Sequence, residues 1–106
     1  MKSFNQVTLM GNLTRDPQLR QTPNGMDVVT IGLALNRSYK VGDEWKEETT
    51  FVDVVAWGPL ALRSAEKLVK GVPVLVKGRL QSRTYEKEGL TVNKLEVIAE
   101  DIVFID

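Results

Sequence analysis

The sequence predicts an all-β fold: a small five-stranded barrel that carries one short helix. Most of the chain alternates apolar and polar residues with the period of two that a half-buried strand requires. Only the segment directly after Gly58 instead spaces its apolar residues three and four apart, as a helix does. The 106 residues contain no repeat, linker or low-complexity stretch, so we assign residues 1–106 to a single domain.

Two strands are predicted in the first third of the chain. An extended segment begins at Val7 and breaks near Asp16-Pro17. Pro23-Asn24-Gly25 is a strong turn signal, because glycine adopts the positive φ angles that tight turns need. From Ile31 to Leu35 large apolar side chains alternate with smaller residues, which indicates the second strand.

The middle of the chain predicts a loop, a strand and the helix. Residues 40–48 contain Gly42-Asp43 and four acidic residues, and we expect a solvated loop there. Residues 49–57 are rich in valine and aromatic residues and predict the third strand. Pro59 suits the first position of a helix, whose end we place at Gly71. The expected apolar stripe of this helix is Leu62, Ala65 and Val69.

Two further strands complete the pattern. They cover Val74 to Tyr85 and Leu90 to Ala99, with a hairpin turn at Glu86 to Gly89 between them and a short apolar piece after them. Five strands with a helix between the third and the fourth is the layout of the OB-fold, a Greek-key barrel. This fold does not by itself decide the ligand, and oligosaccharides and oligonucleotides both remain open.

The composition excludes several kinds of chemistry. The chain has neither cysteine nor histidine, so it offers no thiolate nucleophile, no usual zinc site and no imidazole base to activate its serines. The acids of residues 43–48 lack the spacing of a calcium loop, and no glycine-rich phosphate motif occurs. We therefore expect no catalytic residues, no metal and no cofactor. Apolar runs are too short for a membrane helix and no signal peptide is evident, so we expect an intracellular protein.

The net charge of zero conceals an uneven distribution of charge. Fourteen basic residues balance fourteen acidic ones. Residues 54–94 nevertheless carry eight cations and three acids, whereas residues 43–53 carry five acids and one cation. Because the local field decides whether phosphate is attracted, the balanced total does not exclude nucleic acid.

Strand periodicity brings cations and aromatic rings onto common faces. In the strand from Val74 one face carries Leu75, Lys77, Arg79, Gln81, Arg83 and Tyr85, with no acid among them. In the strand before the helix one face carries Phe51, Asp53, Val55 and Trp57. Bases stack on rings and cations track phosphates, so these faces suit single-stranded nucleic acid. The alternatives are that the rings belong to the core and that the cations form a solvated face.

Several segments in order resemble bacterial single-stranded DNA-binding proteins. They are Asn5 to Pro17, Thr22 to Gly25, Glu44 to Gly58, Lys70-Gly71 and Val76 to Tyr85. The resemblance runs from about Phe4 to Asp106, and it implies an OB-fold that binds single-stranded DNA in replication, recombination and repair. It also implies a homotetramer and a cytoplasmic, nucleoid-associated location.

The resemblance also implies which residues contact DNA. The base-stacking positions of the family fall on Tyr39, Phe51, Trp57 and Tyr85. Together with the charged faces above, it leads us to expect phosphate or polar contacts from Arg15, Arg37, Lys70, Lys77, Arg79, Gln81 and Arg83.

Three features depart from the family pattern. Pro59 stands where a basic residue is frequent, and Asp53 lies on the aromatic face, where it would repel phosphate unless a cation such as Arg83 pairs with it. The acidic tail with which the family recruits replication and repair proteins is absent from this sequence, so we assign no such recruitment. A short, tail-less accessory protein of the primosome type, acting through protein contacts, is the alternative function.

Overall fold

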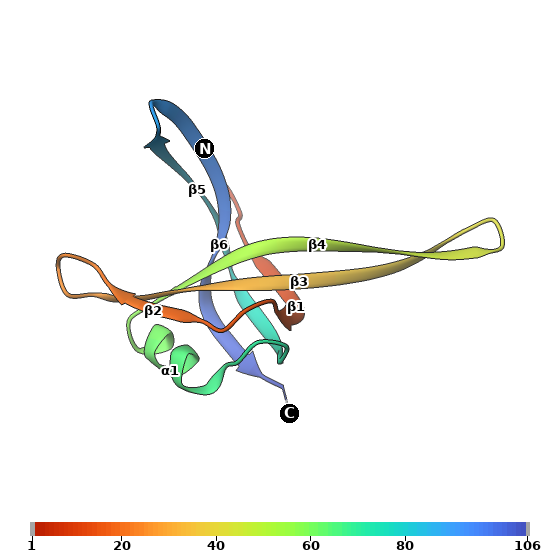
Figure 1. Ribbon diagram of the computed structural model, residues 1–106, viewed down its shortest axis with the longest axis horizontal. Coiled ribbons are helices and arrows are strands. Elements are labelled where there is room, and N and C mark those ends of the chain that lie inside the picture. Colours follow the sequence, from red (N-terminus) through yellow and green to blue (C-terminus); the bar gives the residue numbers. More distant parts are fainter. Residues whose placement is uncertain (1, 106) are drawn as a thin grey trace.

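The computed structural model describes residues 2–105 as six strands and one helix (Figure 1). The elements are β1 (Val7–Leu13), β2 (Gln18–Gln21), β3 (Asp27–Val41), β4 (Glu44–Trp57), α1 (Pro59–Lys67), β5 (Pro73–Lys87) and β6 (Leu90–Phe104).

The strands form one sheet that closes on itself. Their order is β1-β5-β6-β4-β3-β2, and an additional pairing of β1 with β3 completes a five-stranded barrel. The neighbours run antiparallel except β4 and β6, which are parallel where Val54 pairs with Val97. The short strand β2 is an extra strand on the edge of β3 that follows the predicted break at Asp16-Pro17. The all-β class, the OB-fold and the helix between the third and fourth barrel strands are thus confirmed.

The core consists of alternate residues from the barrel strands. Ile31, Leu33, Val54, Val76 and Ile102 are almost completely buried in it, and α1 covers one end of the barrel (Figure 1). Burial of such side chains stabilises a fold by about 1.5–3 kcal/mol each. Because side chains alternate along a strand, the residues between those buried in the core face away from it.

The predicted loop at residues 40–48 is wrong. β3 and β4 continue as a two-stranded ribbon, here the β3–β4 arm, until the turn at Gly42-Asp43, with register Val41↔Glu44 and Arg37↔Glu48. The arm extends beyond the barrel, so both of its faces meet water and neither needs apolar residues (Figure 1). The alternation of apolar and polar residues is therefore absent from the arm, although both strands continue through it.

The expected details of the helix are also wrong. α1 ends at Lys67, and it buries Ala61, Ser64 and the capping residue Leu68, whereas Leu62 and Val69 are exposed. The buried face of the helix therefore differs from the predicted apolar stripe, because the end of the barrel packs against the side that carries Ala61 and Ser64. Gly71 lies in the turn after the helix, where its N–H donates to the Leu13 carbonyl rather than ending the helix.

The last strand is longer than predicted, and it contains an irregularity. β6 runs through Ala99 to Phe104, and its register with β5 shifts between Lys77 and Gly78. A Cβ on Gly78 would lie 2.0 Å from the Ile98 carbonyl oxygen, so only glycine allows the two strands to approach this closely. Within residues 2–105, α1 is too short and too polar to cross a bilayer.

Candidate nucleic-acid interface

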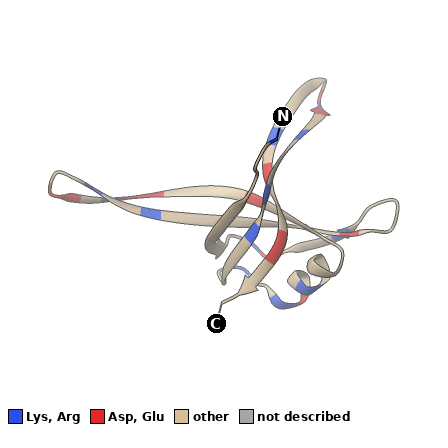
Figure 2. Ribbon diagram, turned by 180° about the vertical axis from the view of Figure 1, so that it is seen from behind, with Lys and Arg blue, Asp and Glu red and all other residues tan. Residues whose placement is uncertain are grey.

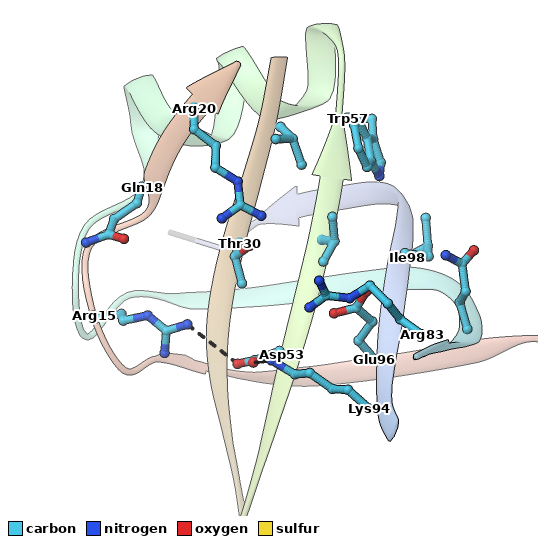
Figure 3. A pocket seen from close by; sticks show the side chains of 13 residues that line it. Arg15, Gln18, Arg20, Thr30, Asp53, Trp57, Arg83, Lys94, Glu96 and Ile98 are labelled. Atoms are coloured by element: carbon cyan, nitrogen blue, oxygen red, sulfur yellow. Dashed lines mark hydrogen bonds and ion pairs between the residues drawn. The ribbon is translucent and has the colours of Figure 1, made fainter. Parts of the chain in front are cut away.

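A groove of about 440 Å³ lies on the side of the sheet that faces away from the core. It crosses β2, β3, β4, β6 and β5, and Figure 3 shows its side chains converging from these strands. Its lining combines apolar, polar and charged residues: Arg15, Gln18, Arg20, Val28, Thr30, Asp53, Val55, Trp57, Gln81, Arg83, Lys94, Glu96 and Ile98.

The floor of the groove is apolar. Val28, Val55 and Ile98 form a second buried cluster, separate from the barrel core. Trp57 stands at one end beside Val28, its partner across the β3–β4 ladder, and remains 42% exposed. An accessible ring above an apolar floor can accept the face of a base.

Asp53 is neutralised by two cations of the groove. Lys94 Nζ donates a hydrogen bond to Asp53 Oδ2, and Arg15 Nη2 lies 3.5 Å from Asp53 Oδ1. The hydrogen bond from Lys94, assisted by the charges of Lys94 and Arg15, lowers the pKa of Asp53 below its ordinary value although partial burial opposes this. The carboxylate is thus ionised and compensated, by partners other than the expected Arg83.

Arg83 instead pairs with Glu96. Its Nε lies 3.3 Å from Glu96 Oε1, and the Glu96 side chain is 5% exposed whereas that of Arg83 is 48% exposed. The pair comes from the partner strands β5 and β6, on the face opposite the core. Arg20 also points into the groove (Figure 3). The groove therefore holds four cations and two carboxylates: Arg15, Arg20, Arg83, Lys94, Asp53 and Glu96. Its net charge favours phosphate.

Gly32 makes the space that Arg15 occupies. Gly32 is the cross-strand partner of Asp53, and a Cβ on it would lie 2.3 Å from both Arg15 Nη1 and Thr14 Oγ1. The missing side chain lets the guanidinium cross β3 and reach Asp53 (Figure 3).

The structure separates the four predicted aromatic residues into two groups. Phe51 and Trp57 share the groove side of β4, and their exposures of 71% and 42% exclude the interpretation that they are core residues. Tyr85 follows Arg83 on the same side of β5, and the guanidinium lies 5.1 Å from its ring centroid. Tyr39 pairs with Lys46 on the opposite side of the β3–β4 arm, where Arg37 covers its ring at 5.1 Å.

The predicted polar contacts are likewise only partly brought together. Arg15, Gln81 and Arg83 line the groove, and Arg79 adjoins it by donating to Gln81 Oε1 at 2.9 Å. Lys77, on β5, pairs with Thr8 of β1 and Asp101 of β6, and it does not line the groove. Lys70 lies in the turn after α1, where its backbone N–H donates to Asp16. Arg37 is on the arm and is paired with Glu48 at 2.8 Å.

Several groove residues were not predicted from the sequence: Gln18, Arg20, Thr30, Lys94 and Glu96. The spacing of Gln18 and Arg20 after Pro17 is that of a strand, so recognition of β2 would have found them. Lys94 and Glu96 alternate in the same way on β6.

A closed OB-fold barrel with a cationic groove bordered by exposed aromatic rings defines a class of oligonucleotide-binding proteins. The model of the single-strand binding protein family matches residues 4–105. The chain belongs to this family.

Known relatives cover almost all of this chain. It is 43% identical over 104 residues to a single-stranded DNA-binding protein of Aquifex aeolicus, covering 97% of this chain and 71% of the relative. It is 38% identical to that of Treponema pallidum, covering 96% of this chain and 58% of the relative. The chain thus spans less than two thirds of some of the curated relatives it matches.

Solved structures agree with this assignment. A deletion mutant of the single-stranded DNA binding protein from Thermus aquaticus superposes with a TM-score of 0.86 and 32% identity, over 97% of this chain and 51% of that one. A Plasmodium falciparum SSB in complex with ssDNA gives a TM-score of 0.89 and 26% identity, over 100% of this chain and 98% of that one.

Proposed function

We propose that this chain binds single-stranded DNA with little sequence preference and without catalysis. One observation carries the proposal: the exposed rings of Phe51 and Trp57 share one sheet face with a groove that holds more cations than acids. The rings accept bases of any sequence, and the cations attract the phosphates. The Plasmodium relative, whose structure is a complex with ssDNA, supports the same ligand.

The stacking residues are tested by truncation and by a matched conservative change. Trp57→Ala and Phe51→Ala should each weaken oligo-dT binding by about 1–3 kcal/mol, the range found for OB-fold single-strand binders. Trp57→Phe keeps an aromatic face and should lose much less. Anisotropy of a labelled oligonucleotide measures all three affinities. Unchanged binding by both alanine variants would show that DNA does not lie on this face.

The cations are tested by the salt dependence of binding. For single strands the logarithm of the affinity should fall with the logarithm of salt concentration by about 0.7 per phosphate neutralised. Affinity that does not respond to salt would refute the role assigned to Arg15, Arg20 and Arg83.

We further propose that the protein is a homotetramer that protects exposed strands during replication, recombination and repair in the cytoplasm. The family membership supports this proposal. Light scattering of the free protein and of its complexes with dT of increasing length would give the oligomeric state and the site size together. A monomer that binds only proteins would instead favour the accessory function of the primosome type.

A further inference from the structure

Trp45 is a large exposed aromatic residue that the four expected stacking positions do not include. It lies on β4 near the tip of the β3–β4 arm and is 70% exposed, almost the same as Phe51 at 71%. Its cross-strand partner is Lys40, and it is neither a member of the two buried clusters nor one of the residues packed against them. Packing therefore does not explain a tryptophan at this position.

Three aromatic residues recur at equal intervals along β4. Trp45, Phe51 and Trp57 are each six residues apart, and the register of β4 with β3 has no shift from Val28↔Trp57 to Val41↔Glu44. Because side chains alternate with a period of two, the three rings lie on the same side of the strand and follow its twist. Six residues of antiparallel strand span about 20 Å.

The charges beside Trp45 suit bases better than phosphates. On its side of the arm the neighbouring charged residues are Lys40 and Glu47, which offset one another. Glu44 and Glu48 point to the other side, where Glu48 is paired with Arg37. Figure 2 shows acidic residues at the tip of this arm, so electrostatic attraction alone would not bring a strand there.

We propose that Trp45 is an additional base-stacking residue, which extends the single-strand track from the groove past Phe51 to the tip of the β3–β4 arm. This inference rests on the proposed function and specifies how far along the arm the strand runs. The added 20 Å accommodates up to about six nucleotides at the stacked spacing of ~3.4 Å. Binding of long oligonucleotides therefore depends on Trp45, whereas binding of oligonucleotides that fill only the groove does not.

The two tryptophans of the chain make a direct test. In Trp57→Phe the only remaining tryptophan is Trp45, and its fluorescence is titrated with oligo-dT while anisotropy of a labelled strand reports binding separately. We expect the emission to be quenched with the same midpoint as the anisotropy change. Binding without quenching would overturn the proposal and leave the proposed function intact, whereas an absence of binding by the unaltered protein would overturn both.

Truncation gives the second measurement. Trp45→Ala should weaken binding of dT of about 30 nucleotides by roughly 5- to 20-fold, with little effect on dT of about 6 nucleotides and an unchanged salt slope. Trp45→Phe should restore most of the loss. Leu90→Ala is the matched control, because Leu90 is also 70% exposed and lies at the end of the β5–β6 hairpin, where it pairs with Lys87. Equal losses for both oligonucleotide lengths would overturn the proposed extension of the track. A change in protein mass by light scattering would instead assign Trp45 to a contact between copies.

Discussion

Replacing Arg83 by methionine would remove the cation that pairs with the Glu96 carboxylate, which is almost completely buried. Breaking a fully buried ion pair costs about 3–5 kcal/mol. The Arg83 side chain is 48% exposed, so water can partly replace it beside Glu96, and we expect a loss of about 2 kcal/mol in the free energy of unfolding. For a chain of this size that corresponds to a decrease in Tm of about 10 °C.

The double variant Arg83→Met, Glu96→Gln separates stability from DNA binding. Removing both charges leaves no uncompensated carboxylate, so most of the lost stability should return. The affinity for oligo-dT should stay low, because the cation that we assign to phosphate is still missing. The salt slope should fall by about 0.7 in both variants relative to the unaltered protein.

Urea unfolding at one fixed protein concentration gives the stabilities, since association would otherwise change them. Anisotropy of labelled oligo-dT at several salt concentrations gives the affinities. Glu96→Gln alone is the control for the loss of the carboxylate. If Arg83→Met is as stable as the unaltered protein, the ion pair between Arg83 and Glu96 does not stabilise the fold. If the double variant also regains DNA affinity, Arg83 does not contact phosphate.

Three other predictions concern single positions. The pKa of Asp53 is lowered in the folded protein, so its contribution to the free energy of unfolding is complete above the ordinary pKa of 3.8 and is lost as the pH falls through the folded pKa. The free energy of unfolding of Asp53→Asn should therefore decrease less on acidification than that of the unaltered protein, as measured by urea unfolding from neutral pH downwards. Gly32→Ala should displace Arg15, cost about 1–3 kcal/mol in urea unfolding and weaken dT binding. Ser64→Ala should not destabilise, and calorimetry should show a Tm equal or higher, because the buried Ser64 Oγ has no hydrogen-bond partner within residues 2–105.

Alternation along single strands predicted much of the candidate interface. The parity of residues 51–57 separates Val54 and Ala56, which are buried in the core, from Phe51 and Trp57, which are exposed. The same reasoning placed Gln81, Arg83 and Tyr85 on one side of β5. It was insufficient for Tyr39, whose membership of the set came from the family resemblance and which lies on the other side of the arm.

The pairing of charges could not be predicted in the same way. The sequence indicated Arg83 as a partner for Asp53, whereas Lys94 and Arg15 occupy that role and Arg83 meets Glu96. Asp53 and Lys94 are 41 residues apart, and their contact depends on β6 lying between β5 and β4 in the closed barrel. Hydrophobic periodicity reports burial along one strand and has no information about the neighbouring strand.

The sequence by itself determined the barrel class, the position of the helix and the sides of the strands that carry rings and cations. These properties are local, since a two-residue period and a proline at a helix start depend only on neighbours along the chain. Only the tertiary structure decided the length of the β3–β4 arm, the buried face of the helix and the partners of Asp53 and Glu96. Those depend on where the barrel ends and on which strands its closure places side by side, and the energy that selects them comes from contacts between residues far apart in sequence.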